Sequence, residues 1–279
     1  MLTTAEIIKK YNFVTKKKLG QNFLLRTSLL ERIVDSAGDI ASHDILEIGP
    51  GLGGLTMAIL QRNPRRLISV ELDAKLAEII NLEIKPLFNN LEILNANALL
   101  VDENVLFDSR FKIIANLPYG IGTTLLMKWL KNCPEKIEKM TLLVQREVAN
   151  RIVATPGTRE YGQLSVICQY LGKVKKCFDI SPGEFLPSPK VTSSLVSLVP
   201  YDNLDPQKSL KFIELANILF RKKRKTILNN MIDSVVNARD ILADCQISPG
   251  ARSEELETKD FVKILEYIQV HNIIPKFFP

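Results

Sequence analysis

The most constraining feature of the chain is a regular alternation of short apolar runs with longer amphipathic stretches over residues 44–153. Phe111–Ala115 is bounded and contains enough β-branched residues to indicate a buried strand, and Asp44–Ile48 is also expected to be a strand. Helical patterns such as Asp73–Ile84 and Gly122–Lys131 separate the apolar runs. This order predicts an α/β fold with a mostly parallel, doubly wound sheet. The other elements expected in this region are strands at Leu67–Glu71, Leu91–Leu94 and Met140–Val144 and helices at Gly54–Gln61 and Gln145–Val153.

A change of pattern near Pro200–Pro206 indicates a domain boundary. Before it, the chain continues with expected strands at Lys173–Ile180 and Ser193–Leu198, and after it the pattern is helical. A length of 279 residues suffices for one large domain and one small domain. We therefore expect a catalytic domain over 1–200, which begins with a basic segment over 1–26, and a small helical domain over 201–279.

Composition restricts the partners and the location of the protein. The net charge of +6 favours an anionic partner. The chain has no apolar stretch of roughly 18 residues and no apolar signal core, so we expect a cytoplasmic protein without a membrane partner. Its four cysteines form no Cys-x-x-Cys pair, and only two histidines are present, so we expect no metal site.

A glycine-rich turn follows the first expected strand and opens a helix. Gly49, Gly51 and Gly54 satisfy the pattern G-x-G-x-x-G, and Glu71 follows at the end of the next strand. The glycines allow close backbone approach, and the carboxylate can accept hydrogen bonds from ribose hydroxyls. The pattern indicates a nucleoside-containing cofactor and leaves open whether this is a dinucleotide or S-adenosylmethionine (SAM). Asn97 follows the third strand, where it can reach an adenine edge, although a solvated loop asparagine has the same pattern.

The segment Asn116-Leu117-Pro118-Tyr119 ends the fourth expected strand. Pro118 cannot continue the strand ladder and biases Leu117 away from the α region. The Asn116 amide oxygen and the Leu117 carbonyl are then two acceptors beside an aromatic ring, which suits a flat ligand that carries an exocyclic NH2 group. The tetrapeptide by itself is also compatible with an ordinary turn at a strand end.

This segment favours a methyl donor over a hydride carrier. An exocyclic aromatic amine is a poor nucleophile, because its lone pair is delocalised into the ring. Hydrogen bonds from both N–H groups to Asn116 and Leu117 favour a more tetrahedral nitrogen whose lone pair faces the methyl group. Positioning then supplies most of the catalysis, and no strong base is needed.

Two basic clusters provide candidate contacts to nucleic acid. A charge run is commonly a solvated helix end, but the positive net charge and the expected base pocket favour contact with phosphates. Phe185, in a proline-rich loop, can stack on an extruded base opposite Tyr119, although a core phenylalanine fits the pattern equally well. The candidate RNA-binding residues are Lys17 and Lys18 near the N-terminus and, on an expected helix, Arg221, Lys222, Lys223, Arg224 and Lys225.

Seven motifs in one order resemble the KsgA family of small-subunit rRNA adenine N6,N6-dimethyltransferases along nearly the whole chain. They are Lys18–Leu24, Leu46–Gly51, Val70–Asp73, Asn116–Tyr119, Tyr161–Val166, Phe185–Val191 and Arg224–Thr226. The resemblance implies a Rossmann-like class I SAM-dependent methyltransferase fold with a small helical C-terminal domain that binds RNA. It implies dimethylation of the N6 amines of two adjacent adenines near the 3′ end of 16S rRNA, in an assembly intermediate of the small ribosomal subunit, by a monomeric enzyme.

The resemblance also assigns roles to individual residues. It places the target adenine between Tyr119 and Phe185, with its amine on Asn116 and Leu117. One position departs from the family pattern, because Asn97 stands where aspartate is usual. The amide lacks the charge, so we expect weaker SAM binding than with aspartate. The residues that the resemblance places against SAM are Asn22, Leu24, Gly49, Gly51, Glu71, Asn97 and Asn116.

Two alternatives remain open from the sequence. An Erm-type methyltransferase that acts on large-subunit rRNA shares the cofactor motifs, but Phe185–Val191 and Arg224–Thr226 fit the KsgA family better. DNA amine and glutamine methyltransferases use a related tetrapeptide that usually contains two adjacent prolines. This chain lacks that Pro-Pro pair. The second alternative is a non-catalytic role in ribosome assembly, in which the basic surface binds pre-ribosomal RNA. That role is compatible with methylation.

Overall fold

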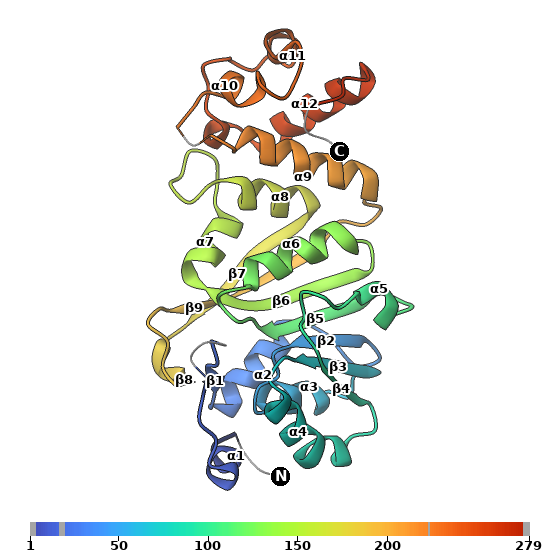
Figure 1. Cartoon of the computed structure of the whole chain (residues 1–279), viewed down its shortest axis with the longest axis vertical. Helices are drawn as coiled ribbons and strands as arrows, with labels where there is room; N and C mark the ends of the chain where they lie inside the picture. The colour runs from blue at the N-terminus through green and yellow to red at the C-terminus, as the bar shows by residue number, and fades with distance from the viewer. Residues whose placement is uncertain (1–3, 17–19, 223, 276–279) are drawn as a thin grey trace. The chain divides into compact units, whose positions relative to one another are not determined.

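The computed structural model of the chain describes residues 4–16, 20–222 and 224–275. The predicted RNA contacts Lys17, Lys18 and Lys223 lie outside these ranges. The chain forms two compact units, the first from residues 1–149 and 174–200 and the second from residues 150–173 and 201–279 (Figure 1). Residues 150–173 therefore join the C-terminal helices in the second unit. None of the helices in the described ranges is long and apolar enough to cross a membrane.

A seven-stranded sheet organises the first unit, with the strand order β4-β3-β2-β5-β6-β9-β7. Its strands are β2 (Asp44–Ile48), β3 (Arg66–Glu71), β4 (Leu91–Asn95), β5 (Phe111–Asn116), β6 (Ile137–Gln145), β7 (Gly172–Ile180) and β9 (Ser193–Pro200). The strands β4, β3, β2, β5 and β6 are parallel to one another. Strand β9 runs antiparallel to β6, with Leu198 opposite Met140. The predicted mostly parallel α/β sheet is confirmed.

The helices of the first unit cover the sheet and explain why its strands are so apolar. All five residues of β2 are buried, as is usual for a parallel strand covered on both faces. A continuous apolar core joins Ile33 of α2 and Ile59 of α3 to Ile45 and Ile114 of the sheet. The helices are α1 (Thr4–Tyr11), α2 (Thr27–Asp35), α3 (Gly54–Leu60), α4 (Ala74–Glu83), α5 (Glu103–Leu106) and α6 (Gly122–Asn132), and α7 (Arg146–Val153) begins in this unit and ends in the second.

The N-terminal segment forms elements that the sequence analysis left unassigned. Helix α1 and the residues after it place Ile7 and Phe13 in an apolar cluster with Phe23, Leu52 and Leu76. The short strand β1 (Phe23–Leu24) pairs antiparallel with β8 (Phe185–Leu186). Helix α1 and Phe13 are therefore packed onto the glycine-rich turn and onto α4.

The second unit is helical around its own core. Its helices are α8 (Gln163–Leu171), α9 (Pro206–Leu219), α10 (Ile227–Met231), α11 (Ala238–Asp244) and α12 (Thr258–Val270). Tyr170 of α8 stacks on Phe212 of α9 with ring centroids 3.6 Å apart, and the Tyr161 hydroxyl donates a hydrogen bond to the Leu256 carbonyl at 2.9 Å. Figure 1 shows α10 and α12 beside α9, in agreement with their contacts. These contacts bind the segment before β7 to the C-terminal helices.

The predicted helix through Arg221–Lys225 is wrong. Helix α9 ends at Leu219, and the following residues form a turn in which Arg224 has a φ of +65°, a left-handed conformation that interrupts a helix. Thr226 then starts α10 by accepting a hydrogen bond from the Asn229 N–H group. The described residues of the basic run thus lie in a loop between two helices, in which Arg221, Arg224 and Lys225 are exposed.

Candidate active site

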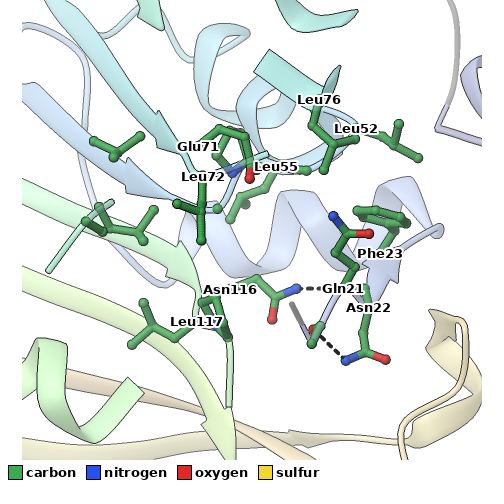
Figure 2. Close-up of a pocket in the computed structure, with 18 of the residues that line it drawn as sticks. Gln21, Asn22, Phe23, Leu52, Leu55, Glu71, Leu72, Leu76, Asn116 and Leu117 are labelled. Carbon is green, nitrogen blue, oxygen red and sulfur yellow. Dashed lines mark hydrogen bonds between the residues drawn. The ribbon is translucent and has the colours of Figure 1, made fainter. Parts of the chain in front are cut away.

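A cavity of about 520 Å³ opens at the carboxyl ends of β2, β3 and β5 in the first unit (Figure 2). The position agrees with the rule that ligands bind at this edge of a parallel sheet. Every predicted cofactor and catalytic residue except Phe185 lines it. The predicted residues in its wall are Asn22, Leu24, Gly49, Gly51, Glu71, Asn97, Asn116, Leu117, Pro118 and Tyr119.

The glycine-rich turn approaches other parts of the chain too closely for side chains. Gly51 has a φ of +60°, and a Cβ atom there would lie 2.6 Å from Cε1 of Phe23. Gly53 has a φ of +82°, and a Cβ atom there would lie 2.1 Å from Cδ1 of Ile84. The left-handed backbone favours glycine at both positions, and at Gly51 the buried Phe23 ring adds a steric reason. Gly53 lies between the glycines of the sequence motif, and the motif alone did not identify it.

Glu71 ends β3 and is held by the backbone on both of its oxygens. Oε2 accepts a hydrogen bond from the Gly51 N–H group at 3.1 Å, and Oε1 accepts one from the Asp73 N–H group at 2.9 Å. Burial raises the pKa of Glu71, and these two N–H groups partly offset that rise. A carboxylate offers about four lone-pair sites, so Glu71 can still accept hydrogen bonds from two hydroxyls of a ligand.

Asp73 is a site-organising residue that the sequence analysis did not assign. Its buried carboxylate accepts hydrogen bonds from Lys16 Nζ at 2.9 Å and from Gln21 Nε2 at 3.0 Å. It also caps α4 by accepting the Lys75 N–H group. Burial alone would raise the pKa of Asp73, but the hydrogen bonds from Lys16 and Gln21 hold it below its usual value. The signal in the sequence was an aspartate just before a helical pattern.

The tetrapeptide after β5 forms the turn that the sequence predicted. Asn116 Nδ2 donates a hydrogen bond to the backbone carbonyl of Asn22 at 3.1 Å (Figure 2). The Leu117 N–H group donates to the Leu143 carbonyl of β6 at 3.1 Å. The hydrogen bond of the turn itself runs from Ile121 to the Pro118 carbonyl at 3.1 Å and does not use the Leu117 carbonyl. These bonds use neither the Asn116 side-chain oxygen nor the Leu117 carbonyl, and both atoms lie at the end of β5.

The Tyr119 ring is fixed by its hydroxyl. The phenol oxygen lies 2.5 Å from Oγ of Ser193, a fully buried residue at the start of β9. Burial raises the pKa of Tyr119, and the hydrogen bond to Ser193 only partly offsets this, so the phenol stays neutral at physiological pH. Ser193 belongs to an apolar strand pattern, which gave no sign of this contact.

Phe185 is not in the cavity wall. Its side chain is 3% exposed and packs in the apolar core, and its Cα is opposite that of Leu24 in the pairing of β1 with β8. The next residue, Leu186, is 45% exposed. The structure therefore does not bring Phe185 to Tyr119 across the cavity. Its predicted stacking on a base stays a prediction that requires the ring to leave the core.

The loop that carries Asn97 is held at both ends. Asn97 Oδ1 accepts a hydrogen bond from the Leu99 N–H group at 3.0 Å. Lys128 of α6 donates to the Ala98 carbonyl at 2.9 Å and pairs with Glu103 at 2.8 Å. The loop thus presents Asn97 to the cavity from a braced position.

The residue pattern that defines the ribosomal RNA adenine dimethylases matches residues 12–270. The chain belongs to the ribosomal RNA adenine dimethylase family. The dimethylase is 36% identical over 263 residues to ribosomal RNA small subunit methyltransferase A of Wolbachia sp. subsp. Drosophila simulans (strain wRi), which covers 94% of this chain and 96% of that protein. It is 38% identical over 257 residues to the protein of the same name from Ehrlichia canis (strain Jake), with 91% and 97% covered. The predicted family and enzyme class are confirmed.

Solved structures agree with this assignment. The dimethylase matches a dimethyladenosine transferase from Plasmodium falciparum with a TM-score of 0.76 and 26% identity, over 92% of this chain and all of that chain. The 23S rRNA methyltransferase ErmE matches with a TM-score of 0.67 and 23% identity, over 88% of this chain and 99% of that one, which supports the fold alone. The Rossmann-like methyltransferase fold predicted from the sequence is confirmed.

Beneath the glycine-rich turn, the dimethylase buries a carboxyl group. Glu47 of β2 is completely buried, and its Oε2 accepts hydrogen bonds from Thr56 at 2.8 Å and Ser69 at 2.7 Å. Its Oε1 has no hydrogen-bond partner within the described part of the chain. Burial raises the pKa of Glu47 to about 7. This group joins β2, β3 and α3 at the point from which the turn departs.

Proposed function

We propose that this dimethylase transfers methyl groups from SAM to the N6 amines of two adjacent adenines near the 3′ end of 16S rRNA. The proposed substrate is an assembly intermediate of the small ribosomal subunit, and the enzyme is proposed to act as a cytoplasmic monomer. The observation that carries the proposal is one cavity in which two oxygen acceptors and a tyrosine ring face the space beside a buried glutamate. The names of the relatives support the small subunit as the substrate.

The residues of the cavity fit SAM. The carboxylate of Glu71 suits the ribose hydroxyls, and the glycine-rich turn, with Gly49 and Gly51 in the cavity wall, lets a ligand approach the backbone closely. Asn97 and Ala98 line the part of the wall that suits an adenine edge. When bound, SAM supplies an electrophilic methyl group on a sulfonium. The protein contributes the site that orients the two reactants.

The residues after β5 are proposed to orient the target amine. Each N–H group of an adenine amine can donate a hydrogen bond, one to Asn116 Oδ1 and one to the Leu117 carbonyl. Two such bonds draw the nitrogen towards a tetrahedral geometry, which frees its lone pair for attack on the methyl group. Tyr119, fixed by Ser193, supplies a flat wall for the base. The neutral phenol cannot act as a strong base, in agreement with catalysis by positioning.

Residues 201–279 are proposed to form an RNA-binding domain. Within it, the basic loop before α10, including Lys223, is proposed to contact RNA phosphates, and Lys17 and Lys18 are proposed to make further phosphate contacts. Arg224 and Lys225 are exposed, whereas Lys222 pairs with Asp233 at 2.5 Å. If a cation contacts a phosphate, its removal should reduce the slope of log affinity against log salt concentration by about 1. We therefore expect Arg224→Ala and Lys225→Ala each to reduce this slope, measured by RNA binding at several salt concentrations. An unchanged slope would remove the loop from the proposed interface.

The decisive experiment is incubation with labelled SAM and undermethylated small subunits, followed by mapping of the labelled nucleotides. We expect label on two adjacent adenines near the 3′ end. Asn116→Ala should reduce the rate by about 10²- to 10³-fold, as removal of one electrostatic contact to the reacting group commonly does. Asn89→Ala, in an exposed turn, is the matched control and should have no effect.

Other outcomes separate the alternatives. Label only on large-subunit RNA would replace the proposal with an Erm-type activity. An Asn116→Ala, Tyr119→Ala double variant that assembles small subunits normally, while a deletion does not, would show that RNA binding matters independently of methylation. Full activity of Asn116→Ala would refute the proposed amine site.

A further inference from the structure

The side-chain amide of Asn116 has a fixed orientation in this structure. An asparagine side chain has a donor end and an acceptor end, and a backbone carbonyl can only accept. Because Asn116 Nδ2 donates to the Asn22 carbonyl at 3.1 Å, the reverse orientation would bring two oxygen atoms together. Figure 2 shows the Asn116 nitrogen directed at Asn22 and the oxygen on the other branch of the amide. The Asn22 carbonyl therefore determines which end of the amide remains available to a ligand.

The position of that carbonyl depends on the residue before it. Gln21 Nε2 donates to Asp73 Oδ2 at 3.0 Å, and the Asp73 carboxylate is fixed because it caps the first turn of α4. The Asn22 side chain donates to the Gly20 carbonyl at 2.9 Å, which closes a local turn. Gln21 is thus the side chain that ties this turn to a helix end in the body of the unit.

We propose that Gln21 is a positioning residue for methyl transfer. Through Asp73 it holds the Asn22 carbonyl, and the carbonyl keeps the acceptor oxygen of Asn116 turned to the target amine. This inference rests on the proposed function, because it requires Asn116 to accept a hydrogen bond from that amine. Gln21 itself acts through Asn22 and Asn116 and is not a catalytic residue.

The geometry also predicts what Gln21 does not control. Glu71 is held by the backbone N–H groups of Gly51 and Asp73, not by the Asp73 side chain. Loss of the Gln21 contact therefore leaves the carboxylate of the cofactor site in place. The same turn carries Asn22, an expected SAM contact, so we expect a variant at Gln21 to lose more in turnover than in cofactor affinity, which a general loss of structure would not do.

The test begins with Gln21→Met, which keeps the length of the side chain and removes its hydrogen bonds. We expect kcat to fall about fivefold, which is ~1 kcal/mol at 1.36 kcal/mol per factor of ten. The Kd of S-adenosylhomocysteine, measured by calorimetry, should stay within about twofold. Lys16→Met is the matched control, because it removes the other side chain bound to Asp73. The Lys16 side chain is exposed, and the buried Asp73 carboxylate keeps its bonds to Gln21 and to the Lys75 N–H group without it, so kcat should not change.

A double-mutant cycle with Asn116→Ala then decides the route of the effect. If Gln21 acts by orienting the Asn116 amide, Gln21→Met has no further effect on kcat in the Asn116→Ala background. Gln21→Asn stays polar but is one methylene too short to reach Asp73, and it should give the same result. The inference is overturned by an unchanged kcat, by an additive loss in the cycle, or by a loss seen only in the Kd. Full activity of Asn116→Ala would instead refute the proposed function.

Discussion

Replacement of Gly51 by alanine tests whether the glycine-rich turn is shaped by contact with the N-terminal segment. The residue has a φ of +60°, and the added Cβ atom would lie 2.6 Å from Cε1 and 2.8 Å from Cδ1 of Phe23. Phe23 cannot retreat freely, because it is buried in a cluster with Phe13 and Leu52. Gly51→Ala therefore combines backbone strain with steric overlap.

The two contributions can be separated by magnitude. A non-glycine residue in the left-handed region costs roughly 1–2 kcal/mol. Overpacking of a buried cluster adds about 1–3 kcal/mol. Gly38→Ala is the matched control, because Gly38 has a φ of +75° and no atom within 4 Å of the added Cβ position. We expect Gly51→Ala to lower the free energy of unfolding by about 1–3 kcal/mol more than the control does.

Urea unfolding monitored by circular dichroism measures this difference, and calorimetry with S-adenosylhomocysteine measures the effect on the site. Gly51→Ala should also weaken binding of that ligand, because the Gly51 N–H group holds Glu71. Gly38→Ala should leave binding unchanged. Equal destabilisation by the two substitutions, or unchanged ligand affinity in Gly51→Ala, would refute the close approach of Phe23 to the turn.

Three further predictions concern the buried and cavity-lining polar groups. Because the folded-state pKa of Glu47 is raised to about 7, its contribution to stability is complete below the unfolded pKa and is lost as the pH rises to about 7. Glu47→Gln should therefore remove a decline of about 3 kcal/mol between pH 4.5 and 7 in urea titrations, and an unchanged pH profile would contradict this. Asn97→Asp keeps an oxygen for the Leu99 N–H group and adds charge, so SAM should bind about five- to tenfold tighter by calorimetry. Equal or weaker binding would show that the Asn97 amide does not lower the affinity for SAM. Lys128→Met removes the cation beside the buried Glu103 carboxylate, which keeps the hydrogen bond from the Trp129 indole, and it releases the Ala98 carbonyl. Thermal unfolding should therefore show a loss of about 3 kcal/mol, together with weaker SAM binding, and a neutral result would exclude the brace.

The sheet was predictable because its strands are buried on both faces. Asp44–Ile48 forms a strand over the predicted range, and the spacing from Gly49 to Glu71 correctly placed both residues at one cavity. A strand that is buried on both faces has an apolar sequence along its length, and no other element of that length explains such a run. Local composition was therefore enough to locate this part of the site.

Features that depend on contacts distant in sequence were not predictable. The basic run around Arg224 became a loop because Thr226 caps a new helix and the Lys222 N–H group donates to Asn230, which a count of cations does not show. The orientation of Phe185 depends on which side of β8 faces the core, and its pairing with β1 fixes that. A strand of two residues carries too little alternation to specify a face.

The packing of α1 has a practical meaning for protein engineering. Ile7 and Phe13 pack with Leu52 of the glycine-rich turn, and the Thr4 hydroxyl oxygen lies 2.8 Å from the position that a Cβ atom on Gly54 would take. A version trimmed to begin at α2 would keep every strand of the large sheet, yet it would uncover the underside of the turn to solvent. Minimal versions of this enzyme should therefore retain the opening helix, and purification tags are better attached with a spacer ahead of it.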